Sequence, residues 1–248
     1  MLPDLPPNYI PHQVLAEQHL TFRWDDWKAS EDFQHDASAL LEATAGITPR
    51  GRIALTIGLY EWVIWRLRFA STDPAPFQIA EAAWCATVDR RYMAHYEFDR
   101  HAWIGPVRGP LWCAMTWLVP AVLLSDDSPE ELESGLSYLT KLAHHVVDDQ
   151  AALDAWTSVT LGRFRRLYPA TPDGPFDDLF GERQEERRGP LLPREILDPS
   201  FSFEPDMTNQ LIDEFLRTVD FNANPFLKSP ELLVAEGFSG VPYRLQPS

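Results

Sequence analysis

Residues 128–146 read SPEELESGLSYLTKLAHHV, and this stretch decides the fold class. Ser128 can cap a helix, Pro129 suits its first turn, and Glu131 can reach back to complete a capping box. Four leucines and a valine then recur three or four residues apart, at positions 132, 136, 139, 142 and 146. Because this spacing places the apolar side chains on one face, the stretch predicts an amphipathic helix.

Similar start residues and apolar stripes recur along the rest of the chain. We expect further helices that begin near Ser30, Thr48, Phe77, Pro110, Asp148, Asp206 and Ser229. The first of these is expected to end at Gly46, and the helix from Phe77 to continue to Phe98. Segments that alternate with period two are scarce, so a large sheet is not predicted. The sequence therefore predicts an all-α fold, a single-domain irregular helical bundle.

The two regions without helical periodicity are an N-terminal arm, residues 1–29, and a segment at 169–205. The second holds seven prolines and is dense in charge, which is typical of a long loop. We therefore expect one helical domain over residues 1–248, with a long acidic Pro-rich loop inside it.

Composition limits the classes of function. Hydrophobic residues make up 45% of the 248 residues, and nine Trp and fourteen Phe supply bulky material for a core. The net charge is −16. Because a field of that sign repels phosphate backbones and anionic lipid surfaces, we expect no nucleic-acid or membrane partner. Acidic side chains can simply keep a protein soluble, or part of the acidic surface can dock on a basic partner.

The chain start, MLPDLPP, has neither a basic region nor an apolar core, so it does not resemble a secretory signal. The longest apolar stretch, residues 111–124, is shorter than the about 20 residues that a membrane span needs, and it predicts a buried helix. Cys85 and Cys113 both lie in apolar helical stretches and are expected to be buried free thiols. These features together predict a cytoplasmic protein.

The densest group of potential metal ligands is His144 and His145 followed by Asp148 and Asp149. If the helix continues, His144 and Asp148 share a face, as do His145 and Asp149. A metal site would still need a ligand from elsewhere. The alternative is that the histidines end one helix and the aspartates begin the next, where each suits the helix dipole.

His95, Asp99 and His101 form a second, looser group with the same two interpretations. Glu61 lies on a very apolar helix, so a buried carboxylate there needs a partner, and Arg90, Arg91 or Arg100 could supply it. Such a carboxylate can be an acid catalyst or half of a structural ion pair, and we favour the ion pair. Neither a nucleophile motif nor a phosphate-binding or dinucleotide-binding motif occurs, so we predict no catalytic residue and no cofactor.

Residues for binding a partner are predicted in two places. The loop acids are Asp177, Asp178, Glu182, Glu185 and Glu186. The N-terminal stretch 22–27 mixes aromatic and acidic side chains, and its candidates are Trp24, Asp25 and Asp26. The alternative for this stretch is an arm whose tryptophan rings cover the core.

In general character the chain resembles the immunity proteins of bacterial toxin systems, which are compact, acidic and cytoplasmic. The resemblance covers the whole chain but rests on no residue motif, so it transfers no functional residues. It implies a protein-binding inhibitor, not an enzyme, that neutralises a toxin by covering a basic active site. The alternatives are a helical metalloprotein or enzyme that uses a His/Asp cluster, and a helical adaptor subunit.

Overall fold

The computed structural model describes residues 5–16, 19–170 and 184–245 and is all-α, as the sequence predicts. No strand occurs in these ranges; the pairings Ile47–Pro169 and Met93–Leu227 are isolated bridges. The helices of the described chain are α1 (His12–Ala16), α2 (Ser38–Thr44), α3 (Pro49–Arg66), α4 (Ala75–Val88), α5 (Gly105–Leu123), α6 (Pro129–Val146), α7 (Gln150–Leu167), α8 (Gln184–Arg188), α9 (Thr208–Thr218) and α10 (Pro230–Ala235).

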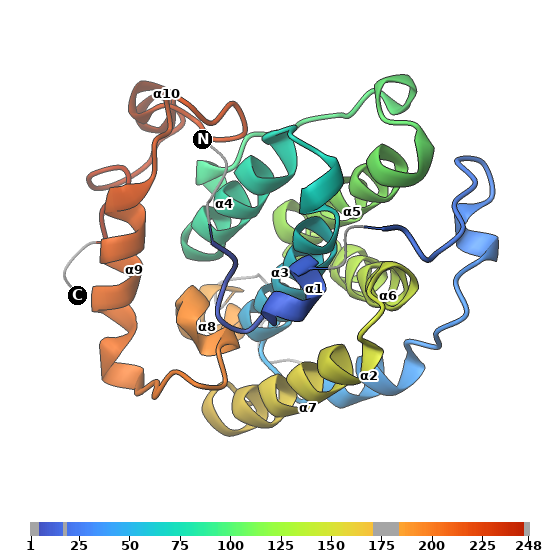
Figure 1. Cartoon of the computed structure of the whole chain (residues 1–248). Coiled ribbons are helices and arrows are strands. Elements are labelled where there is room, and N and C mark those ends of the chain that lie inside the picture. Colours follow the sequence, from blue (N-terminus) through green and yellow to red (C-terminus); the bar gives the residue numbers. More distant parts are fainter. Residues whose placement is uncertain (1–4, 17–18, 171–183, 246–248) are drawn as a thin grey trace.

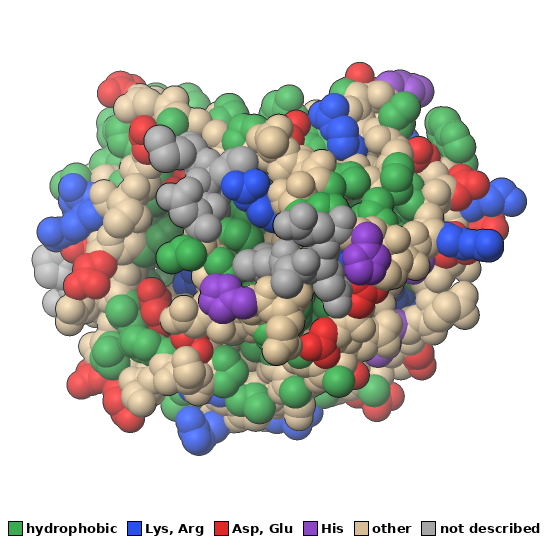
Figure 2. All heavy atoms as spheres, in the orientation of Figure 1, with side chains coloured by type: hydrophobic (Ala, Val, Ile, Leu, Met, Phe, Trp, Pro, Cys, Tyr) green, Lys and Arg blue, Asp and Glu red, His purple; other side chains and the backbone are tan. Residues whose placement is uncertain are grey.

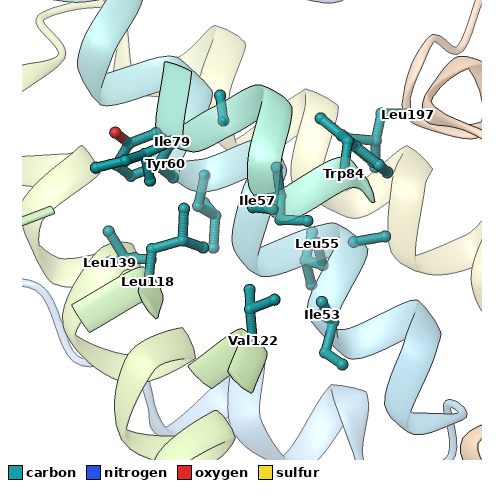
Figure 3. Close-up of a cluster of buried hydrophobic side chains, with 14 of the residues drawn as sticks. Ile53, Leu55, Ile57, Tyr60, Ile79, Trp84, Leu118, Val122, Leu139 and Leu197 are labelled. Atoms are coloured by element: carbon teal, nitrogen blue, oxygen red, sulfur yellow. The ribbon is translucent and has the colours of Figure 1, made fainter. Parts of the chain in front are cut away.

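Helix α3 forms the centre of the molecule, and α4, α5 and α6 pack around it (Figure 1). Nearly all of its residues are buried, including the charged Arg50, Glu61 and Arg66, so the helix is enclosed on every side. The Thr48 hydroxyl accepts a hydrogen bond from the backbone N–H of Gly51 and so caps the helix start, as predicted. Figure 3 shows side chains of α3 meeting Ile79 of α4, Leu118 of α5 and Leu139 of α6.

Helices α5 and α6 approach each other closely at Gly135. A Cβ atom added to Gly135 would lie 2.5 Å from the Cβ of Ala121 and 2.8 Å from the backbone oxygen of Trp117. Because a backbone oxygen cannot swing aside, the glycine sets the distance between these two helices.

We expect Gly135→Ala to destabilise the protein by about 1–3 kcal/mol, because the new methyl group overpacks this contact. Gly162, in α7, is the matched control, since a Cβ there would meet nothing within 4 Å. Gly162→Ala is expected to stabilise by about 0.5–1 kcal/mol through helix propensity alone. Urea denaturation of both variants measures the difference, and equal effects at the two sites would contradict the close packing.

Two predicted helix boundaries, one start and one end, are wrong, and at each an aspartate carboxylate accepts from a backbone N–H two residues further along. The helix expected from Ser30 begins only at Ser38, where the Asp36 carboxylate accepts hydrogen bonds from the backbone N–H of Ser38 at 3.0 Å and from its hydroxyl at 2.7 Å. The helix expected to reach Phe98 ends at Val88. Asp89 is extended and accepts from the backbone N–H of Arg91 at 2.9 Å, and this turn competes with helix continuation.

The structure also corrects one predicted helix cap and one predicted helix start. Helix α6 begins at Pro129 as expected, but Ser128 makes no side-chain capping bond, so the predicted capping box is wrong. The Ser128 carbonyl instead accepts from the backbone N–H of Glu131 at 3.0 Å. Helix α5 begins at Gly105, five residues before the expected Pro110, because a carboxylate from the N-terminal segment caps it.

Helices α9 and α10 lie along one side of this core. Helix α9 stands at the left edge of the view in Figure 1, with α10 above it. Asp206 was expected to cap α9, but it lies in a 3-10 turn and no side chain caps the helix. The start of α10 is as predicted, since the Ser229 hydroxyl accepts from the backbone N–H of Leu232 at 3.3 Å. Among the described residues, no helix is both long enough and apolar enough to cross a membrane.

Candidate functional site

The predicted loop acids fall into two groups. Asp177, Asp178 and Glu182 lie outside the described residues. Glu185 and Glu186 belong to α8, and both are exposed.

Glu185 is bound within the protein. Its carboxylate pairs with the guanidinium of Arg50, and its second oxygen lies 3.4 Å from Arg188. Arg50 is 2% exposed and also donates to the backbone oxygen of Thr87 at 3.0 Å and to that of Gly189. Burial lowers the pKa of the Arg50 side chain, and the hydrogen bond that Arg50 donates to Glu185 opposes this shift. Glu185 therefore holds α8 against α3, and a partner would have to compete for it.

Asp26 has a structural role that the sequence pattern does not reveal. Its carboxylate oxygens accept the backbone N–H of Gly105 at 3.0 and 2.9 Å, and one of them accepts from Nε1 of Trp24 at 2.8 Å. A negative charge at a helix N-terminus is stabilising, and here it comes from 79 residues away. The Trp24 ring is half-buried on α5, where a Cβ added to Gly109 would lie 2.1 Å from its Nε1.

Trp27, unlike the half-buried Trp24, is 75% exposed. The guanidinium of Arg100 lies 4.8 Å from the Trp27 ring and 5.1 Å from the ring of Trp112, so the cation sits against two indoles. Nε1 of Trp112 donates to the backbone oxygen of Phe98 at 3.1 Å, which fixes that ring. An exposed indole on such a support is held in place before any partner arrives.

The neighbours of Trp27 make it the centre of a surface. Asp25 is exposed, and its carboxylate accepts from the backbone N–H of Trp27 at 2.9 Å. Asp99 and Ile104 are also exposed and lie on the loop that carries Arg100. Figure 1 shows this loop running into α5 while the N-terminal segment passes along the right edge. We call residues 25–27 and 99–104 the Trp27 surface. Asp25 and Asp26 are among the binding residues predicted from the sequence, and Trp27 is not.

The histidine pair at the end of α6 does not form the predicted helix face. Helix α6 ends at Val146, so Asp148 and Asp149 leave it. Asp148 pairs with Arg66 at 2.7 Å, and Asp149 caps α7 by accepting from the backbone N–H of Ala152 at 3.0 Å. The alternative interpretation, one helix ending and the next beginning, is the one that the structure has.

His144 and His145 have different neighbours. The ring of His144 stacks on that of His35, with centroids 3.5 Å apart, and its Nε2 lies 3.3 Å from Oδ1 of Asp154. His145 bonds through Nε2 to the backbone oxygen of Arg23 at 2.7 Å. Within residues 5–16, 19–170 and 184–245, no three His, Cys, Asp or Glu side chains are grouped to hold a metal ion.

The His35–His144 stack makes folding stability sensitive to acid. Burial lowers the pKa of His144, the charge of His35 acts in the same direction, and Asp154 opposes both. The unfolded state therefore takes up this proton at a higher pH than the folded state does, so stability falls as the pH falls through about 6.5. We expect wild type to lose more stability than His144→Gln between pH 7.5 and 5.5. Parallel urea-denaturation curves over this range would contradict the prediction.

The second histidine group is dispersed. His95 and His101 are both exposed and lie on the irregular segment between α4 and α5. Asp99 does not share a helix face with His95, because it caps a 3-10 turn by accepting from the backbone N–H of His101 at 3.0 Å. The segment thus supplies part of the Trp27 surface and no cluster of ligands.

Glu61 is the buried carboxylate of α3, with 1% of its surface exposed. Its partner is Arg194, at 2.6 Å, and not the predicted Arg90, Arg91 or Arg100. The hydroxyl of Tyr9 also donates to this carboxylate, as does Nε1 of Trp84 at 3.2 Å. Burial raises the pKa of Glu61, and Arg194 opposes that shift. The group is thus a hydrogen-bonded ion pair that ties three distant parts of the chain to α3.

No family model, curated protein or solved structure matches this chain. Its function must therefore be argued from the geometry of its own residues.

Burial favours the protonated form of both thiols. Cys85 and Cys113 are both free, the first buried and the second partly buried. Burial raises the pKa of Cys85 well above its ordinary value and that of Cys113 to about 11. Since the thiolate is the reactive form, both groups are poorly reactive at neutral pH.

Proposed function

We propose that this protein is a binding protein that inhibits a basic protein partner, and most concretely an immunity protein that neutralises a bacterial toxin. The observation that carries the proposal is the exposed Trp27, which is braced by Arg100 and flanked by Asp25 and Asp99. Tryptophan is the residue most enriched among binding hot spots, and a fixed ring loses little entropy when a partner covers it.

Charge supports the class of partner. The chain carries 37 acidic and 21 basic Lys and Arg residues, so its field attracts a positively charged protein from a distance. A nuclease-type or other anion-binding active site is basic, and an acidic inhibitor placed over it also excludes the anionic substrate. In this proposal the acids of this region, among them the exposed Glu186, steer the approach, while the Trp27 surface makes the contact.

The proposed setting is the cytoplasm, where a toxin that enters the cell would meet its inhibitor. Two free thiols suit a reducing compartment. Catalysis is not part of the proposal, because Glu61 is engaged in an ion pair and both cysteines have raised pKa values.

The proposal is tested by co-expression with the product of the gene adjacent to the one that encodes this chain. We expect cells that express that product to stop growing, and to recover when this protein is co-expressed. Trp27→Ala should fail to restore growth at equal expression level, while Leu232→Ala, an exposed apolar residue on α10, should restore it.

An adaptor subunit would give a different result in the same experiment. It would form a stable complex with its partner but would not relieve any toxicity. Normal growth of cells that express the neighbouring product alone, or rescue that is indifferent to Trp27, would overturn the proposed role of this surface.

A further inference from the structure

Residues 33–36 lie between the Trp27 surface and α2 in the chain and have no regular secondary structure. Among the described residues, no backbone–backbone hydrogen bond joins them to another part of the protein. Two of their rings instead pack on the end of α6. The ring centroid of Phe33 lies 5.2 Å from that of His145, and the centroid of His35 lies 3.5 Å from that of His144. Side-chain contacts with two adjacent histidines therefore hold this segment in place.

The stack of His35 on His144 can carry one added proton but not two. The two ring planes are 3° from parallel, and His144 is 8% exposed, so water screens charges there poorly. If both rings were protonated, two positive charges would face each other in direct contact. A like charge at this distance strongly disfavours the second ionisation. The rings therefore stay stacked with no proton or one proton added, and they separate when each takes up a proton.

The charged groups around the stack do not remove this conflict. From α7, Oδ1 of Asp154 lies 3.3 Å from Nε2 of His144 and can balance one positive charge. The other charged or titratable groups that face the pair have both signs, and they are Lys141 and His145 on α6 and Arg23, Asp32 and Asp36 on the N-terminal segment. Figure 2 shows histidine, acidic and basic side chains intermixed on the right, where Figure 1 draws this segment. Because opposite charges in such a mixture largely cancel, they do not balance a second proton on the stack.

An open cavity of about 540 Å³ borders the two rings. His35 and His144 both line it, together with the side-chain amides of Gln34 and Gln150. Protons reach the rings from solvent through this cavity, and the partly exposed ring of His35 can turn into it. The pair can therefore respond to pH while the helices remain folded.

We infer that the His35–His144 stack is a latch that opens in acid: uptake of the second proton separates the rings and releases residues 32–36 from the end of α6. Residues 25–27 stay in place, because Asp26 remains bonded to the backbone of Gly105 in α5. The inference concerns the free protein, so it does not depend on the proposed inhibition of a partner.

The sign of the pH dependence follows from the proton that opening takes up. Because a solvated histidine has a pKa of about 6.5, the open form is favoured increasingly as the pH falls below that value. Burial lowers the pKa of His144, and the charge of His35 acts in the same direction, so the closed form takes up protons less readily than the open form.

Backbone 15N relaxation of the wild-type protein at pH 7.0 and pH 5.0 tests the latch. We expect order parameters of residues 32–36 near about 0.85 at pH 7.0, as in a rigid backbone, and below about 0.6 at pH 5.0. Residues 25–27 and helix α7 should stay rigid at both pH values. Unchanged order parameters in residues 32–36, or an equal loss throughout the helices, would overturn the inference.

Two variants show whether charge on this pair opens the latch. His35→Phe keeps a flat ring that can stack on His144 but cannot take up a proton, so residues 32–36 should stay rigid at pH 5.0. His95→Phe is the matched control, because it removes an exposed histidine from the segment between α4 and α5 and should open like wild type. Circular dichroism confirms that each variant is folded. Mobile residues 32–36 at pH 5.0 in His35→Phe, or rigid ones in both variants, would overturn the assignment to this pair.

Discussion

Trp27→Ala is expected to weaken binding to the protein partner by about 2–4 kcal/mol, or roughly 30- to 700-fold in Kd. The expected loss is large because the ring is 75% exposed in the free protein and can be covered entirely by a partner. Arg100 would also lose one of the two rings that hold it. The effect should appear mainly in the dissociation rate, because the substitution removes contact area and no charge.

Two controls separate binding from folding at this position. Trp27→Phe keeps an aromatic ring over Arg100 and should retain part of the affinity. The thermal midpoint of Trp27→Ala should lie close to that of wild type, since the side chain is mostly in solvent. Surface plasmon resonance with the purified partner measures the affinities, and a change below threefold would remove Trp27 from the contact.

The second large effect is expected at Glu61, where Glu61→Ala should destabilise the protein by about 3 kcal/mol or more. The substitution leaves the hydroxyl of Tyr9 and the indole N–H of Trp84 without their acceptor and removes the ion partner of Arg194. Arg194 is partly exposed and can turn toward water, so most of the loss comes from the two buried donors and the lost packing.

Glu61→Gln distinguishes these contributions. The glutamine keeps an oxygen that can accept from Tyr9 and Trp84 but has no charge for Arg194, so its effect should be clearly smaller than that of Glu61→Ala. Glu214→Ala on the surface of α9 should change stability by less than about 0.5 kcal/mol. Urea denaturation measures all three, and a loss at Glu61→Ala as small as that of the surface control would contradict the buried network.

What the sequence predicts well are the features that local residues decide. Helix α3 follows from a Thr-Pro start and from apolar residues three and four positions apart, and α10 from a Ser-Pro start. Helix α6 follows from its apolar stripe, although its capping bond differs from the expected one. In each case the interactions that begin the helix lie within one turn, so a local pattern is enough.

The features that the sequence does not predict depend on distant residues. Helix α5 begins early because Asp26 caps it from 79 residues away, and the partner of Glu61 comes from a 3-10 turn at Arg194–Leu197. The contrast between Trp24 and Trp27 has the same origin. One ring fits against Gly109 of α5 and the other does not, and neither fact is encoded in the stretch around them.

The binding role of the predicted residues stays a prediction, but the structure shows which of them are engaged within the fold. Asp25, in the N-terminal stretch, is exposed. Asp26 and Trp24 instead hold α5, and Glu185 holds α8. A count of acidic residues cannot separate these roles, because it does not record which carboxylates are already engaged within the fold.

The most direct test of the account is hydrogen exchange of backbone amides, measured by mass spectrometry on the free protein and on its complex with the neighbouring gene's product. The account predicts that the complex slows exchange in residues 25–28 and 99–105, which carry Trp27 and Arg100. Slowed exchange confined to α9 and α10, with residues 25–28 and 99–105 unchanged, would contradict it.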